Sequence, residues 1–153
     1  MKLQAVTICI NYADFLECIV RNQRHFDRWI IVTVPEDHET IAVCRRHGLE
    51  FLFSRVLRPD GRDFHSSFNK SRILNEGLDA LDQHGWTAIL DSDVLLPRHF
   101  REQVCALPLE CGALYGMAGR KICPDRDMFE ALKWCEPWDR FCHAISSSRV
   151  ECS

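Results

Sequence analysis

Short apolar runs rich in branched residues alternate along this 153-residue chain with segments whose apolar residues recur at helical spacing. The runs cover residues 5–10, 29–34, 49–53 and 86–90. A parallel sheet produces this alternation, because each strand must be joined to the next by a crossover, usually a helix. Its strands are covered on both faces, so they read as continuous apolar runs. The sequence therefore predicts an α/β fold with a mostly parallel sheet.

The segments between the runs carry the spacing and the end signals of helices. We expect helices over residues 14–26, 38–47 and 67–83, and another that opens at Pro97. Asp14 is a candidate N-cap of the first helix, and Gly48 follows the second as its C-terminal glycine. The third is expected to bury Leu74, Leu78 and Leu81 and to end at Gly85.

The remaining segments have weaker patterns. Residues 54–66 contain Pro59, Asp60 and Gly61 without periodicity, which predicts a loop of a length that is often functional in compact domains. Residues 112–117 are a candidate fifth strand, and residues 128–135 a candidate helix. At this length we expect one domain.

Composition narrows the classes of function. The formal net charge is −3, which argues against a general nucleic-acid or membrane-surface binder. The longest apolar runs are far shorter than the roughly 20 residues of a membrane span. Lys2 precedes an apolar stretch that Gln4 and Asn11 interrupt, unlike a secretory signal. The sequence therefore predicts a cytoplasmic protein with no transmembrane segment and no nucleic-acid partner.

The chain has nine cysteines, an odd number, and none has the C-x-x-C spacing of zinc ribbons or redox motifs. Cys9, Cys18 and Cys44 lie among apolar residues, where reduced cysteine behaves as a small core residue. We expect these three to be buried thiols. Cys135, Cys142 and His143 are a less favoured metal group, because their spacing matches no tight chelate.

Polar residues follow each apolar run. They are Asn11-Tyr12, Pro35-Glu36-Asp37, Ser54-Arg55 and Asp91-Ser92-Asp93. In an open parallel sheet, ligands bind outside the carboxyl ends of the strands, so these groups are expected at one edge. Residues 55–72 add five basic side chains against two acidic ones. Acidic groups facing a basic segment suit a metal-bound polyanion, because carboxylates hold the cation while Lys or Arg neutralises phosphate.

The D-x-D pattern alone is weak, since 12 Asp in 153 residues give about one such match by chance. Asp125-Arg126-Asp127 is a second match, but it follows Cys123-Pro124 and not a buried strand. Only the pair at Asp91 and Asp93 has the expected strand before it. The alternative interpretation is that Asp91 or Ser92 merely begins the turn before a helix.

Four segments together make the sequence similar to the GT-A fold glycosyltransferases that use nucleotide sugars, particularly the small family 2 type. They are AVTICINY at 5–12, IIVTVPED at 30–37, FNKSRILNEGL at 68–78 and AILDSDVLLP at 88–97. The resemblance spans about residues 4–100 in order. It implies a three-layer α/β/α, Rossmann-like sandwich with a nucleotide-sugar-binding core at 1–100 and a short C-terminal part at 101–153 on the acceptor side.

The resemblance also implies roles for individual residues. Those implied to contact the nucleotide sugar are Tyr12, Glu36, Asp37, Lys70, Arg72, Asn75 and Asp91. Asp91 and Asp93 are implied ligands of Mn²⁺ or Mg²⁺. The acceptor is a glycan, lipid or protein, and the candidate bases are Asp125, Asp127, Glu130 and Asp139. The second strand lacks the family's usual pair of acidic residues before a glycine-serine turn, and only 60 residues follow Asp93.

Simpler interpretations stand beside these roles. Lys70, Arg72 and Asn75 also suit an exposed helix face, and Tyr12 suits plain packing. Trp134 and Trp138 suit either a core or a stacking surface for sugar. A non-catalytic nucleotide-sugar-binding module is the alternative function. A sugar nucleotidyltransferase or a dinucleotide oxidoreductase is disfavoured, because no glycine-rich phosphate loop follows the first strand.

Overall fold

A computed structural model describes residues 1–55, 69–82, 84–116 and 127 of the chain. The chain divides into two compact units, Met1–Leu96 and Pro97–Ser153, and each is described by itself. Several predictions lie outside the described residues. They are most of the loop at 54–66, the helix at 128–135, the candidate bases Asp125, Glu130 and Asp139, the group of Cys135, Cys142 and His143, and Trp134 and Trp138.

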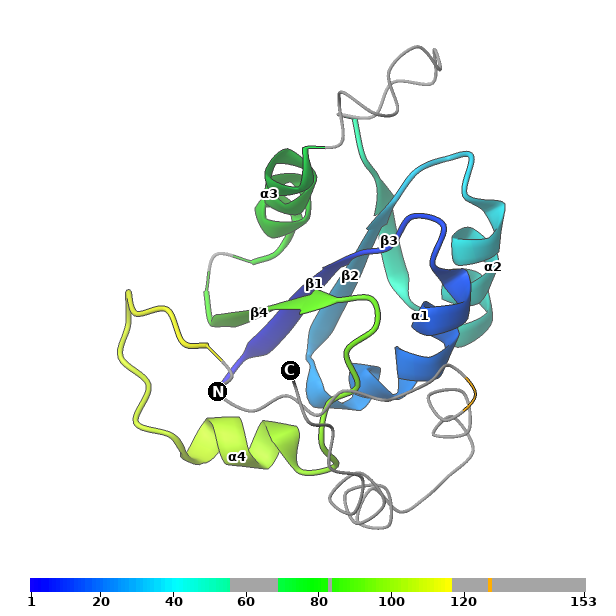
Figure 1. Ribbon diagram of the computed structural model, residues 1–153. Helices are drawn as coiled ribbons and strands as arrows, with labels where there is room; N and C mark the ends of the chain where they lie inside the picture. Colours follow the sequence, from blue (N-terminus) through cyan, green and yellow to red (C-terminus); the bar gives the residue numbers. More distant parts are fainter. Residues whose placement is uncertain (56–68, 83, 117–126, 128–153) are drawn as a thin grey trace, which may run out of the picture. The chain divides into compact units, whose positions relative to one another are not determined.

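The first unit contains a parallel sheet of four strands (Figure 1). The strands are β1 (Leu3–Ile8), β2 (Arg28–Thr33), β3 (Glu50–Phe53) and β4 (Trp86–Asp91). Their order is β3-β2-β1-β4, and all three pairings are parallel. The α/β class and the four strands expected from the apolar runs are therefore confirmed.

Burial follows each strand's position in the sheet. The two central strands, β1 and β2, are almost entirely buried. On β4, which is an edge strand among the described residues, exposed and less exposed residues alternate, and Ile89 is 50% exposed. A continuous apolar run thus indicates full burial only for the central pair.

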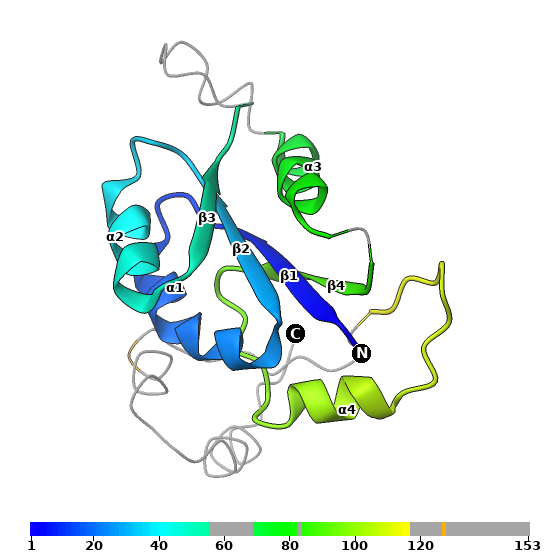
Figure 2. The ribbon, with the colours of Figure 1, turned by 180° about the vertical axis from the view of Figure 1, so that it is seen from behind.

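The described helices are α1 (Ala13–Ile19), η1 (Val20–His25, a 3-10 helix), α2 (His38–His47), α3 (Lys70–Ala80) and α4 (Phe100–Ala106). Helices α1 and α2 lie next to each other, and α3 lies apart from them in both views (Figures 1 and 2). Helix α4 belongs to the second unit. Across the described residues, no helix is long and apolar enough to cross a membrane.

Helix α2 matches its prediction at both ends. The Asp37 carboxylate caps its beginning by accepting a hydrogen bond from the backbone N–H of Thr40. Gly48 ends it at φ 65°, and its N–H donates to the carbonyl of Cys44. A positive φ of this kind is easily adopted by glycine, which explains the residue at this position.

Other helix ends were predicted wrongly. Tyr12, not Asp14, is the N-cap residue of α1, and Asp14 lies in the first turn, where its charge favours the helix dipole. Helix α4 begins at Phe100 because Pro97 belongs to the preceding turn, in which its carbonyl accepts from the N–H of Phe100. Gly85 does not end α3. It lies next to the backbone of Lys2 at φ 119°, where an added Cβ would be 2.8 Å from the Lys2 oxygen.

The fifth strand expected at 112–117 is absent from its described part, residues 112–116, which form a turn followed by irregular chain. The alternation of apolar residues there is too short to select a strand without a neighbouring strand to pair with.

The core between α3 and the sheet contains Val6, Ile30, Val32, Ile73 and Leu81. Leu81 is buried as expected, but Leu74 and Leu78 are only partly buried at the margin of this cluster. Ile73 and Gly77 are the residues of α3 that are fully buried. The helix is therefore rotated from the orientation that its leucines predict, because a glycine, which carries no side chain, faces the two central strands.

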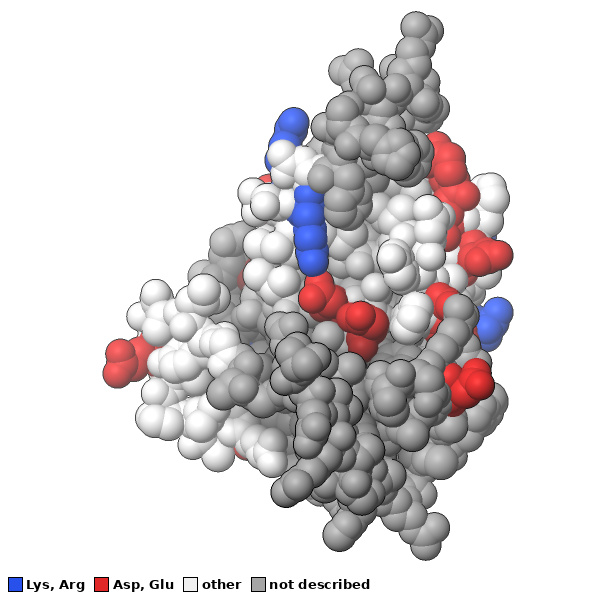
Figure 3. Space-filling model, viewed as in Figure 1, with Lys and Arg blue, Asp and Glu red and all other residues white. Residues whose placement is uncertain are grey.

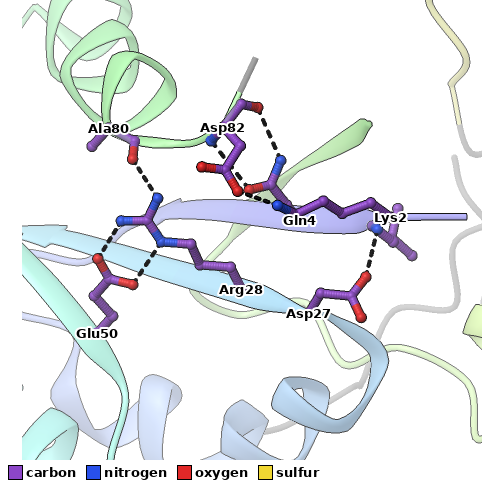
Figure 4. Close-up of polar contacts among 8 residues, drawn as sticks. Lys2, Gln4, Asp27, Arg28, Glu50, Ala80 and Asp82 are labelled. Carbon is purple, nitrogen blue, oxygen red and sulfur yellow. Dashed lines mark hydrogen bonds and ion pairs between the residues drawn. The ribbon is translucent and has the colours of Figure 1, made fainter. Parts of the chain in front are cut away.

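Side chains from the beginnings of β1 and β2 hold the C-terminal end of α3 (Figure 4). Arg28 Nη1 donates to the carbonyl of Ala80 at 2.6 Å, while Arg28 also pairs with both carboxylate oxygens of Glu50 at 2.5 and 2.8 Å. The buried amide of Gln4 exchanges two hydrogen bonds, of 3.0 and 3.2 Å, with the backbone of Asp82. These contacts satisfy polar groups at the helix end and fix the position of α3 against the sheet.

Cys9, Cys18 and Cys44 are buried free thiols, which confirms the core role expected for them. Burial is the main cause that raises the pKa of Cys9 to about 11 and that of Cys44 to about 12. Thiolates are the nucleophilic and metal-binding form, so the raised pKa values favour neutral thiols at Cys9 and Cys44, in keeping with a structural role.

Candidate functional site

The candidate site lies at the carboxyl edge of β1 and β4. These strands are neighbours, and Ile8 of β1 is paired with Asp91 of β4. The chain places β2 and β3 on one side of β1 and then returns to place β4 on the other. The strand order therefore reverses between β1 and β4, and ligands of open α/β sheets bind at such a reversal.

Asp91 and Asp93 lie on a tight turn at this edge. Asp91 is the last residue of β4, and its carbonyl accepts a hydrogen bond from the N–H of Val94 at 3.3 Å. Both aspartates are exposed. The turn presents two carboxylates at the carboxyl end of β4, which is where they were expected from the sequence, and the strand order shows that this end lies at the reversal point.

A buried asparagine anchors the chain that follows this turn. Asn22 of η1 is fully buried, its Nδ2 donates to the carbonyl of Val94 at 2.8 Å, and its Oδ1 accepts from the N–H of Leu96 at 3.0 Å. Sequence reasoning missed this role. The only signal available was an asparagine in the middle of a predicted helix, where asparagine is unfavourable.

Lys70 contacts one of the two aspartates. It is the first residue of α3, and its Nζ donates to Asp91 Oδ1 at 2.7 Å. The two side chains are 59% and 50% exposed. Figure 3 shows basic and acidic side chains meeting on the face it presents. The cap of α3 explains the position of Lys70, because Asn69 Oδ1 accepts from the N–H of Arg72 and so begins the helix at Lys70.

Asp37 is buried, and both of its carboxylate oxygens accept hydrogen bonds from other groups of the protein. One carboxylate oxygen accepts from the N–H of Thr40 at 3.0 Å, and the other accepts from the N–H of Asn11 at 2.7 Å and from Thr33 Oγ1 at 3.4 Å. Only 5% of Asp37 is exposed. This carboxylate holds the end of β1 against α2.

Asn11 has a positive φ of 61°, a conformation that asparagine tolerates better than most residues. Asp37 holds this conformation through the N–H of Asn11. The next residue, Tyr12, is 54% exposed, and its ring packs against Phe15 with the ring centres 5.9 Å apart. Asp37 thus acts on this edge by positioning the chain that carries Tyr12.

The other predicted site residues are exposed. Glu36 lies in the turn before α2, while Arg72 and Asn75 lie on α3. Of the sequence-predicted site residues, Lys70 and Asp91 are therefore in direct contact. Asp37 joins the end of β1 to the beginning of α2.

Glu76 is a further residue that sequence reasoning missed. Its carboxylate accepts from Ser54 Oγ at 2.6 Å and from the N–H of Arg55 at 3.0 and 3.2 Å. It therefore holds the chain leaving β3 against α3. No local sequence signal pointed to this role, because the two partners lie 22 and 21 residues away in the sequence.

Asp91 and Asp93 supply part of the oxygen ligands that a hard divalent cation needs. Among the described residues, no group of three or more His, Cys, Asp or Glu side chains is arranged to hold a metal. Asp91 and Asp93 supply oxygen ligands, and Mg²⁺ is commonly held by one or two carboxylates together with substrate phosphates and water. The Lys70 ammonium group shows that Asp91 already accepts positive charge at this position.

Searches against models of protein families and against curated proteins found no match to this chain. The class of protein is therefore defined by its structure alone. The described residues form an α/β protein with a parallel sheet that has charged side chains at its carboxyl edge.

Proposed function

We propose that this protein is a metal-dependent glycosyltransferase that moves a sugar from a nucleotide-diphosphate donor to an acceptor hydroxyl. The observation that carries the proposal is the position of Asp91-Ser92-Asp93, which begins with the last residue of β4 at the point where the strand order reverses. Lys70 adds an ammonium group at the same place. Carboxylates and an ammonium group together suit a cation bridged to phosphate.

The proposed fold is the three-layer α/β/α form of the GT-A type. The strand order supports it, because crossovers between parallel strands are right-handed. With right-handed connections, two successive crossovers in one direction, through α1 and α2, followed by one in the opposite direction, through α3, favour a position of α3 on the other face of the sheet.

In the proposed reaction, the bond between the anomeric carbon and the diphosphate oxygen breaks, and a bond from that carbon to the acceptor oxygen forms. Asp91 and Asp93 would hold Mn²⁺ or Mg²⁺, which supplies Lewis-acid stabilisation of the leaving diphosphate. Lys70 and Arg72 would neutralise phosphate charge, and Tyr12 would stack on the base. A carboxylate would take the acceptor proton.

Other roles in the proposal depend on the resemblance. Glu36 and Asn75 are exposed at positions that the donor would contact, whereas Asp37 would act indirectly, through the backbone of Asn11. A glycan, lipid or protein acceptor and a cytoplasmic location stay predictions of the sequence.

The test is thermal unfolding with UDP or GDP, with and without Mn²⁺, for the parent and Asp93→Ala. A ligand at about 100 times its dissociation constant adds roughly 2.7 kcal/mol. We expect the midpoint to rise by about 5–10 °C, at roughly 2–4 °C per kcal/mol. The rise should need Mn²⁺ and should be lost in Asp93→Ala.

Asp79→Ala is the matched control, because Asp79 is also an exposed aspartate but lies on α3 near its C-terminal end. It should keep the full rise. Absence of a rise with every nucleotide tested would contradict the proposal.

A non-catalytic nucleotide-sugar-binding module is the second candidate. This candidate needs only the groups on the donor side, and the two aspartates and Lys70 that would form them all lie within the unit Met1–Leu96. Such a module would show the same Mn²⁺-dependent rise in stability. It would not hydrolyse the bound donor, whereas a transferase does so slowly in the absence of acceptor.

A further inference from the structure

Lys70 and a divalent cation would need the same carboxylate. The Lys70 Nζ atom is 2.7 Å from Asp91 Oδ1, which is a direct ion pair. A cation coordinated by Asp91 must displace the ammonium group or accept it as a close neighbour of like charge. Either way, Lys70 opposes binding of the metal by itself.

A bound diphosphate would reverse this opposition. Its oxygens carry negative charge next to the cation, so an ammonium group displaced from Asp91 gains new acceptors close by. Lys70 begins α3, and its ammonium group is carried on a flexible stem of four carbons. The side chain can therefore change partner without movement of the helix.

We propose that Lys70 acts as a latch on Asp91, which weakens binding of the metal alone and makes metal and nucleotide diphosphate bind together. The Lys70 ammonium group pairs with Asp91 and moves to phosphate when metal and nucleotide are both bound. This inference rests on the proposed function and concerns the regulation of the same site.

Lys70→Met tests the latch, because methionine keeps much of the side-chain length and removes the charge. Mn²⁺ binding is measured without nucleotide, by the loss of the electron paramagnetic resonance signal of free Mn²⁺. Since exposed ion pairs of this kind are weak, we expect Mn²⁺ to bind about two- to fivefold more tightly to the variant.

Nucleotide binding should change in the opposite direction. With Mn²⁺ present, UDP or GDP binding is measured by calorimetry. Loss of a charge-assisted hydrogen bond to phosphate should weaken that binding about tenfold in Lys70→Met. If Lys70 had a purely structural role, the substitution would weaken the binding of both Mn²⁺ and the nucleotide. It would not strengthen one and weaken the other.

Lys2→Met is a closely matched control. Lys2 forms an ion pair with Asp82 near the other end of α3, and its side chain is 44% exposed against 48% for that aspartate. This variant removes the same charge from the same kind of pair. Both affinities should stay within about twofold of the parent.

The outcomes separate the two proposals. Tighter Mn²⁺ and weaker nucleotide binding in Lys70→Met, with Lys2→Met unchanged, support the latch. If the parent binds both ligands and Lys70→Met binds Mn²⁺ no more tightly, the latch is wrong and the proposed function stands. If neither the parent nor Lys70→Met binds Mn²⁺ or nucleotide, both proposals are wrong.

Discussion

Asn22→Ala is expected to lower the free energy of unfolding by about 3 kcal/mol. The substitution removes the hydrogen bonds to the carbonyl of Val94 and the N–H of Leu96. The bond to Leu96 is buried, so its N–H is left without a partner, which costs about 1–3 kcal/mol. Loss of the second bond and the small cavity left by the amide account for the rest.

The measurement is urea unfolding followed by circular dichroism, with the free energy extrapolated to zero urea. Gln23→Ala is the control, because Gln23 is the adjacent amide and is exposed. It should change stability by no more than about 0.5 kcal/mol. Equal effects of the two substitutions would show that Asn22 does not anchor the chain after Asp93.

The same variant bears on the candidate site. Asn22 holds the chain directly after the turn that carries Asp91 and Asp93. In the folded Asn22→Ala protein, well below its unfolding midpoint, we therefore expect weaker Mn²⁺-dependent nucleotide binding. Unchanged binding would mean that the turn keeps its shape through β4 alone.

Gly77→Ala is expected to destabilise the protein by about 3 kcal/mol, even though alanine favours helices by about 1 kcal/mol over glycine. A Cβ at this position would be 2.3 Å from Val6 Cγ2 and 2.8 Å from Val32 Cγ2. Both valines are fully buried on the central strands. The helix must shift away from the sheet, which places the cost at the upper end of the range for overpacking.

Urea unfolding measures the effect of Gly77→Ala, of a control substitution and of a second substitution that should partly restore stability. Asp79→Ala, on the exposed surface of the same helix, should change stability by about 0.5 kcal/mol or less. Val6→Ala makes space for the new methyl group, so the double variant with Gly77→Ala should be more stable than the sum of the single effects by about 1 kcal/mol. Strict additivity would show that Gly77 and Val6 do not meet.

The strands could be predicted from the sequence because each one lies in a local apolar run. A run of five or six such residues can be recognised without knowledge of distant contacts. The bounds of helix α2 could be predicted, and Gly48 was identified as its C-terminal glycine, but Asp37 was expected to contact the nucleotide sugar and only the structure shows that it caps the helix. The ends of α1 and α4 could not be predicted. Asp and Pro are both favourable at several positions near the beginning of a helix. The presence of Asp14 and Pro97 therefore does not determine the residue at which α1 or α4 begins.

The orientation of α3 depended on a distant partner. Its leucine spacing predicted one buried face, yet Ile73 and Gly77 are the residues that pack fully against the sheet. Gln4 and Arg28 hold the end of this helix from positions 78 and 52 residues away in the sequence. Local periodicity contains no information about such contacts.

The candidate site divides in the same way. Residue types and strand ends were enough to place Asp91 and Asp93 after a strand and to expect acidic and basic groups at one edge. They were not enough to separate the roles of two similar aspartates. Asp37 is buried under three internal hydrogen bonds, whereas Asp91 is exposed and pairs with Lys70.

The physical reason is the range of the interactions involved. Apolar runs, helix caps and turn glycines act over a few residues, so the amino-acid sequence specifies the α/β class and the strand positions directly. Strand order, the close approach at Gly77 and the partner of each carboxylate depend on segments that are distant in sequence, 21 residues for Lys70 and Asp91 and 26 for Asn11 and Asp37. Those contacts exist only once the sheet has formed and has brought β1, β4 and α3 together.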